Sequence, residues 1–212
     1  MSGILDLLSS DLGKQIISGV SSSSNQPADK TASVLSMAMP FLLGAMKKNA
    51  STPQGAEGLL GALAGKHDGG ILDNLGGLFD GGVDKSVTDD GAGILGHILG
   101  GSQGNVENAL SQKSGMDVGS VANILKVAAP ILMGVLGKET RQNKVNDTNG
   151  LGSLLGGMLG GQAKQDQSFL ESLLDADNDG SIIDDVAGMV LGGGQKKKGG
   201  LGGLLGGLFG KR

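Results

Sequence analysis

The stretch Ala128-Ala129-Pro130-Ile131-Leu132-Met133-Gly134-Val135-Leu136 decides the fold, and Ala38-Met39-Pro40-Phe41-Leu42-Leu43-Gly44-Ala45-Met46 repeats its design ninety residues earlier. Both are apolar runs with a proline followed four residues later by a glycine. Around the second run, apolar residues recur at spacings of three, four and seven, which is the helical period. A helix that is apolar around so much of its circumference belongs in the middle of a bundle. Because a mid-helix proline removes a backbone hydrogen bond, at a cost on the order of 3 kcal/mol, we expect a kink near 35–39.

The composition favours helices and excludes several classes of function. Glycine makes up 42 of 212 residues, and the four aromatic residues are all Phe. The remaining core formers are Leu, Ile, Val, Met and Ala, which suit helices better than sheets. The absence of cysteine excludes disulfides, thiolate metal sites and a cysteine nucleophile. A formal net charge of −4 argues against a general nucleic-acid binder.

The sequence predicts a cytoplasmic protein. The stretch Met1-Ser2-Gly3-Ile4-Leu5-Asp6 lacks the basic start and long apolar core of a secretion signal. Neither proline-bearing run reaches the roughly 18 uninterrupted apolar residues of a spanning helix. Lys47 and Lys48 end the first run, and Lys126 interrupts the second.

Periodicity and capping signals predict helices along most of the chain. The clearest start signals are Ser51-Thr52-Pro53 and Asp117, and Pro27 is expected at the start of another helix. Polar residues predict a loop at 21–26 and a linker at 139–148. The predicted helices cover residues 3–20, 30–48, 51–65, 71–79, 86–99, 105–113, 117–136, 151–159, 168–174 and 181–191.

The two halves of the chain align, which predicts an internal duplication. Pro40 matches Pro130 at an offset of 90, and the run 86–90 matches 181–185 at an offset of 95. Two related copies of about this size predict an internally duplicated, all-α, multi-helical bundle with glycine-rich short helices. We place the copies at 1–101 and 102–193, followed by a Lys-rich linker and Gly/Leu amphipathic tail at 194–212.

The run Ala109-Leu110-Ser111-Gln112-Lys113-Ser114-Gly115-Met116 and the following helix with Pro130-Ile131-Leu132 resemble the YidB-like family of bacterial proteins, domain of unknown function 937. The resemblance extends from about Ala109 to Leu136. The first copy is less similar, because 21–24 replaces the serine-glycine turn. The resemblance implies a multi-helical fold and supplies no activity.

One acidic loop resembles a calcium site: Asp175-Ala176-Asp177-Asn178-Asp179-Gly180-Ser181-Ile182. Its carboxylates at positions one, three and five, glycine at six and aliphatic residue at eight reproduce the start of an EF-hand loop. Ser181 would offer its backbone carbonyl at position seven. Position twelve is Val186 instead of an acid, while Asp184 and Asp185 stand at ten and eleven. Because one residue on a helix is about 100° of rotation, Asp185 closes the site only in a contracted loop.

The same residues also fit a helix start without metal. Ser181-Ile182-Ile183-Asp184 and Ser86-Val87-Thr88-Asp89 both resemble capping boxes, and acids stabilise the first helical turn. In the first copy Gly82 and Lys85 replace the third ligand and the turn glycine, so we expect no ion there. For the second copy, both alternatives stay open: a structural Ca²⁺ held by residues 175–185, or a capped helix alone.

The tail Leu201-Gly202-Gly203-Leu204-Leu205-Gly206-Gly207-Leu208-Phe209 nearly copies 151–159 and places its apolar residues on one helical face. Four glycines cost a helix about 4 kcal/mol relative to alanine, so the tail needs a surface. That surface is its own bundle, another copy of the protein or, given the flanking Lys196–Lys198, Lys211 and Arg212, an anionic membrane.

Isolated His67 and His97 are best explained as ordinary surface histidines rather than as ligands or bases. The glycine patterns at 91–96 and 100–104 follow no predicted strand, so they are not nucleotide or nucleophile motifs. The sequence therefore predicts a non-enzymatic helical scaffold or interaction module that self-associates through glycine-faced helices and does not bind nucleic acid. The alternatives are a peripheral membrane protein that uses its tail and, less favoured, a hydrolase that uses its acidic turns.

Overall fold

The computed structural model describes residues 3–160, which form helices and connecting turns without any strand. The all-α prediction is therefore confirmed for this part of the chain. The helices are α1 (Ile4–Ser9), α2 (Asp11–Ser23), α3 (Ala28–Asn49), α4 (Pro53–Ala64), α5 (Gly70–Asp73), α6 (Leu75–Phe79), α7 (Lys85–Leu99), the 3-10 turn η1 (Gly100–Ser102), α8 (Gln103–Ser114), α9 (Val118–Gln142) and α10 (Thr148–Leu159).

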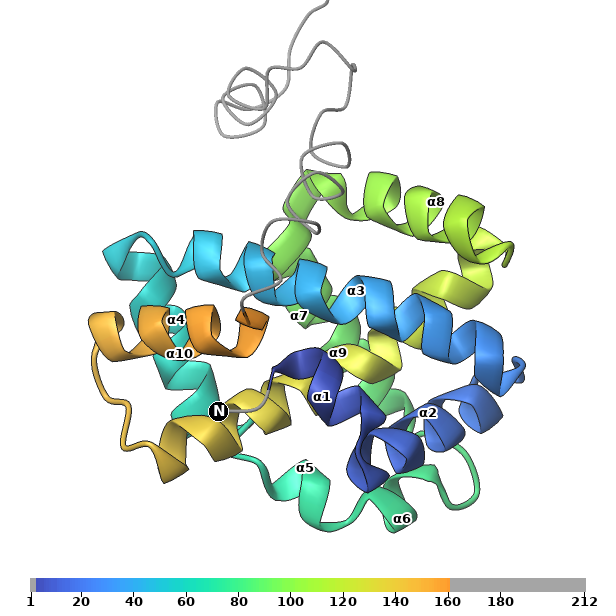
Figure 1. Cartoon of the computed structure of the whole chain (residues 1–212), viewed down its shortest axis with the longest axis horizontal. Helices are drawn as coiled ribbons and strands as arrows, with labels where there is room; N and C mark the ends of the chain where they lie inside the picture. The colour runs from blue at the N-terminus through green and yellow to red at the C-terminus, as the bar shows by residue number, and fades with distance from the viewer. Residues whose placement is uncertain (1–2, 161–212) are drawn as a thin grey trace, which may run out of the picture.

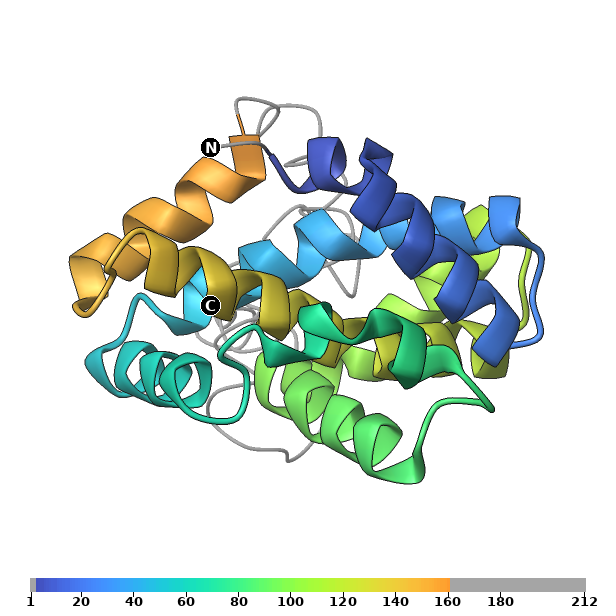
Figure 2. The same ribbon diagram turned by 90° about the horizontal axis from the view of Figure 1, so that it is seen from below.

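The two proline-bearing helices, α3 and α9, pack against each other and form the centre of the bundle (Figure 1). Seen from below, α1, α2 and α10 lie on one side of this pair, while α4, α5 and α7 lie on the other (Figure 2). Both helices continue through their prolines, and Pro40 and Pro130 are themselves buried. The predicted central position of the two stretches is confirmed, whereas the kink stays a prediction.

The helix that follows each member of the central pair packs on the other member of the pair. α4 follows α3 in the chain and packs on α9, whereas α10 follows α9 and packs on both α3 and α4. Such an exchange is compatible with two related halves. The division into 1–101 and 102–193 stays a prediction, because residues 161–193 lie outside the described residues.

Three predicted boundaries need correction. The helix expected at 3–20 is two helices, because Ser10 is extended and its hydroxyl accepts the Gly13 N–H at 3.2 Å. The piece expected at 71–79 breaks at Asn74, whose Oδ1 accepts the Gly77 N–H. α9 runs to Gln142 rather than ending near Leu136, because its last turns still pack on the bundle through buried residues such as Thr140.

Two glycines let segments approach α9 closely. A Cβ on Gly91 of α7 would lie 1.8 Å from the backbone carbonyl oxygen of Lys126 on α9. A Cβ on Gly137 of α9 would lie 1.8 Å from the carbonyl oxygen of His67. Only glycine fits at either crossing, and these contacts fix where α7 and the segment after α4 lie on the core.

Among residues 3–160, only α9 is long and apolar enough, by length and composition, to cross a membrane. However, 67% of its apolar window is buried inside the bundle, as in the core helix of a soluble protein. The cytoplasmic location stays a prediction.

Candidate functional site

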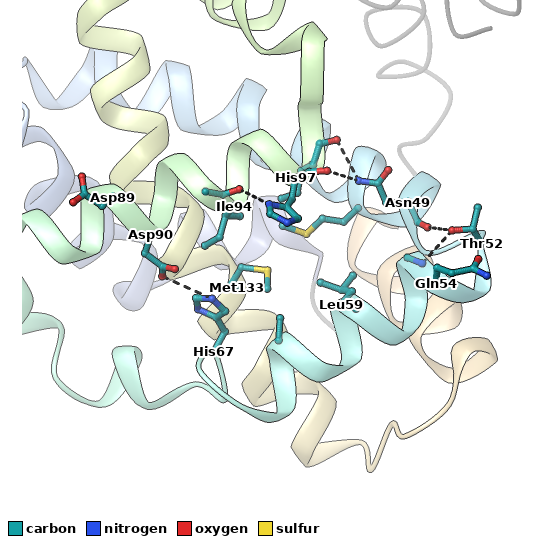
Figure 3. A pocket seen from close by; sticks show the side chains of 16 residues that line it. Asn49, Thr52, Gln54, Leu59, His67, Asp89, Asp90, Ile94, His97 and Met133 are labelled. Carbon is teal, nitrogen blue, oxygen red and sulfur yellow. Dashed lines mark hydrogen bonds and ion pairs between the residues drawn. The ribbon is translucent and has the colours of Figure 1, made fainter. Parts of the chain in front are cut away.

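A groove with a volume of about 670 Å³ lies between α4 and α7. Met46 of α3 and Met133 of α9 line it, with exposed fractions of 1% and 3%. In Figure 3, α4 and α7 border the groove on opposite sides, and the Met133 side chain lies between them. The volume falls within the range of about 300–1,000 Å³ that is typical of binding sites.

The walls of the groove consist of aliphatic side chains and of glycines that leave open space between them. Leu59 on α4 and Ile94 and Ile98 on α7 are half-buried. Gly58 and Gly93, one on each wall, are exposed, and a Cβ at either position would meet nothing within 4 Å. The walls thus offer an apolar surface that a partner backbone can approach closely.

One end of the groove is polar and uncharged. The Asn49 side-chain amide donates to the carbonyl oxygens of His97 and Ile98, both at 3.3 Å, and so ties the end of α3 to the end of α7. Thr52 caps α4, because its hydroxyl accepts the Gly55 N–H at 3.1 Å. This end is therefore held by hydrogen bonds that connect three helices.

The other end carries a histidine and a carboxylate. Asp90 pairs with Lys66 at 2.6 Å, and its second oxygen lies 3.7 Å from Nε2 of His67. Burial lowers the pKa of His67 below its usual 6.5, and this effect exceeds the opposing attraction of Asp90. The side chain is only 9% exposed, so His67 is a neutral, packed imidazole near pH 7. The prediction of a surface histidine is wrong for His67.

His97 lies on the rim of the same groove, and its Nδ1–H donates to the Gly93 carbonyl oxygen at 3.0 Å. The two histidines look isolated in the sequence, where thirty residues separate them. They line one groove only because α4 and α7 dock side by side on α9. No local sequence signal marks this arrangement.

The residues predicted to bind calcium, Asp175, Asp177, Asp179, Ser181, Asp184 and Asp185, lie outside the described residues. Within 3–160, no three His, Asp or Glu side chains are placed to hold a metal ion. The acidic turn of the first half instead starts a helix: Asp84 is the N-cap of α7 and accepts the Ser86 N–H at 3.1 Å. The prediction that a capping box begins at Ser86 is therefore wrong. The N-cap lies two residues earlier, at Asp84, and its carboxylate accepts the Ser86 N–H.

A family model described as "Bacterial protein of unknown function (DUF937)" matches residues 6–139. The chain belongs to this family. The DUF937 segment contains every residue that lines the α4–α7 groove, whereas α10, the acidic loop and the tail follow it. No curated protein and no solved structure is significantly similar to the chain.

Proposed function

We propose that this DUF937 protein is a non-enzymatic helical interaction module whose α4–α7 groove binds an amphipathic helix from a second copy of the chain. The observation that carries the proposal is the groove itself, with its methionine base, aliphatic walls and glycine gaps. Recognition of a helix by a groove uses aliphatic anchors at helical spacing, and glycine lets the two backbones approach. Such a lining supports contact with a helix better than it supports chemistry on a substrate.

A segment with the required pattern exists in the chain. Residues 201–209 repeat 151–159 at an offset of 50, with leucine or methionine at the four stripe positions. In α10 that stripe is buried against α3 and α4, with exposed fractions from 0% to 3% for Leu151, Leu154, Leu155 and Met158. The α10 stripe shows how this sequence pattern packs on the bundle, and residues 201–209 carry the same pattern.

Charge favours the same partner. The region 194–212 has five basic residues and no acidic one. The α7 wall of the groove carries Asp89 and Asp90, of which Asp90 already pairs with Lys66 at 2.6 Å. Asp89 pairs with Lys85 at 2.6 Å, but both side chains are mostly exposed, so this pair contributes little and exchanges readily.

The test is binding of a fluorescein-labelled peptide of residues 194–212, measured by anisotropy, to the full chain carrying Leu204→Asp and Leu205→Asp. These two substitutions disrupt the apolar face of the chain's own tail, so that the labelled peptide alone presents an intact tail sequence. Adding Ile94→Asp should weaken binding by about tenfold or more, because it places a charge in an apolar contact. Gly58→Asp should act similarly without removing any packed side chain. Val118→Asp is the matched control, since Val118 is 36% exposed and does not line the groove.

The proposal fails if the peptide does not bind, or if it binds the Ile94→Asp and Gly58→Asp chains as tightly as the Val118→Asp chain. Flotation of the same peptide with anionic phosphatidylserine vesicles tests the membrane alternative. If the peptide floats with the vesicles at low salt and does not bind the groove, the result would support a peripheral membrane protein instead. We also propose a cytoplasmic location for the interaction module.

A second candidate function is structural calcium binding by Asp175, Asp177, Asp179, Ser181, Asp184 and Asp185. The Asp-x-Asp-x-Asp-Gly spacing of 175–180 supports it. Calcium should raise the melting temperature of the full chain relative to chelator, and Asp177→Ala with Asp179→Ala should remove the difference. Identical melting curves for all four samples would eliminate the site.

A further inference from the structure

We propose that His67 makes the α4–α7 groove sensitive to pH, so that the groove binds its partner helix while the imidazole is neutral and releases the helix when the imidazole is protonated. The inference rests on the helix-binding groove of the proposed function and adds the regulation of that site. It follows from where His67 lies and from the charged groups that surround it.

The backbone of His67 is held at one end of the groove by two helices. Its N–H donates to the Ala62 carbonyl oxygen of α4 at 3.0 Å. Its own carbonyl oxygen lies against Gly137 of α9, where a Cβ would be only 1.8 Å away. Figure 3 shows the imidazole turned toward Asp90 of α7, whose carboxylate oxygen lies 3.7 Å from Nε2. A change of charge on the ring therefore acts on the groove and on both of its walls.

The charged groups around His67 leave an imidazolium without a carboxylate of its own. They come from three segments: Asp89, Asp90 and His97 on α7, Lys66 and Asp68 after α4, and Lys138 and Arg141 on α9. Each of the three carboxylates already pairs, at 2.6–3.1 Å, with Lys66, Arg141 or Lys85. Glu57 of α4 and Glu139 of α9 do not line the groove. A proton on His67 therefore adds a positive charge that no unpaired carboxylate of the groove balances.

A positive charge at this end of the groove opposes the proposed partner. The region 194–212, which supplies the helix, has five basic residues and no acidic one. Like charges repel over about 10 Å at an ionic strength of about 0.1 M. The apolar face of the partner would also meet an imidazolium, which needs water or a carboxylate to be stable there. Both effects favour release of the helix from the protonated chain.

Burial couples the proton to the helix. His67 is only 9% exposed, and burial lowers its pKa more than the attraction of Asp90 raises it. A helix in the groove removes the remaining water and disfavours the charged form further. Because such coupling is reciprocal, a proton on His67 weakens helix binding by the same factor as the helix weakens proton binding. If the helix lowers the pKa by about one, affinity falls about tenfold at low pH.

Peptide binding at two pH values tests this switch in the full chain carrying Leu204→Asp and Leu205→Asp. The values are about pH 7.5 and about pH 5.5, on either side of the ordinary histidine pKa of about 6.5. The probe is residues 194–212 with a blocked N-terminus and a rhodamine dye, whose fluorescence is insensitive to pH in this range. The segment contains no His, Asp or Glu, so the probe keeps its charge.

Anisotropy is compared between chains with both histidines intact, with His67→Gln and with His97→Gln. His97 is the matched control, because it is the only other histidine in the sequence and is exposed at the rim of the same groove. We expect affinity to fall about tenfold or more at the lower pH in the intact and His97→Gln chains, and less than about twofold in the His67→Gln chain. Circular dichroism checks that each chain stays helical. An equal loss of affinity in all three chains would overturn the switch.

Proton NMR of the His67 Hε1 signal gives a second measurement that needs no substitution of His67. The His97→Gln chain leaves one histidine and so assigns the signal. Saturating peptide should lower the pKa of His67, whereas an unchanged or raised pKa would overturn the switch. Failure of the peptide to bind at about pH 7.5 removes the proposed function itself. Tight binding that does not depend on pH removes the switch and leaves that function intact.

Discussion

At the scale of single residues, His67 makes stability depend on pH. Burial lowers its folded-state pKa below 6.5, so the unfolded chain takes up a proton at a higher pH than the folded chain. Stability rises with pH wherever the unfolded state binds more protons. The contribution of His67 is therefore complete above about pH 6.5 and decreases as the pH falls from there toward the lower folded-state pKa.

We expect the free energy of unfolding to fall as the pH drops below about 6.5, and His67→Gln to flatten that decrease. Urea titrations at several pH values measure it. His97→Gln serves as the control, because His97 is exposed at the rim. A His67→Gln chain whose stability falls as steeply as that of the native chain would contradict this account.

Two threonines differ in how their hydroxyls are satisfied. Thr31 is fully buried, and its hydroxyl has no hydrogen-bond partner among the described residues. Thr52 caps α4. Thr31→Val should therefore stabilise the protein by about 1 kcal/mol, whereas the same change at Thr52 should destabilise it by about 1 kcal/mol. Thermal melts measure both, and a loss of stability in Thr31→Val would show that the hydroxyl has a partner.

At the scale of helices, α7 contains glycines with opposite roles. Gly91 crosses α9 where a Cβ has no room, whereas Gly96 is exposed with nothing within 4 Å of a Cβ. Gly91→Ala should cost about 1–3 kcal/mol through overpacking. Gly96→Ala should instead stabilise by about 0.5–1 kcal/mol, because alanine favours the helix. Equal effects of the two changes, measured by denaturant unfolding, would refute the close crossing of α7 and α9.

Helix starts with strong local chemistry could be predicted, and helix breaks could not. Thr52 before Pro53 and Asp117 before α9 are visible in the sequence because the cap and its helix are neighbours. The breaks at Ser10 and Asn74 interrupt continuous apolar periodicity. The extension of α9 to Gln142 depends on packing with segments far away in the chain, which periodicity does not report.

At the scale of the whole molecule, the central pair was predictable and the groove was not. Pro40 and Pro130 lie in runs so apolar that only a core accommodates them. The groove combines residues from α3, α4, α7 and α9 with His67, and none of these segments carries a binding motif. It exists because α4 and α7 dock side by side on α9, at glycine crossings that look in the sequence like any other glycine.

The most direct test of the account is methyl NMR of the full chain labelled at methionine, which has eight such residues. Met46 and Met133 line the groove, whereas Met116 is buried away from it and serves as an internal control. If a helix fills the groove, Leu204→Asp with Leu205→Asp should shift the Met46 and Met133 methyl signals and leave the Met116 signal in place. Unchanged Met46 and Met133 signals would contradict the account.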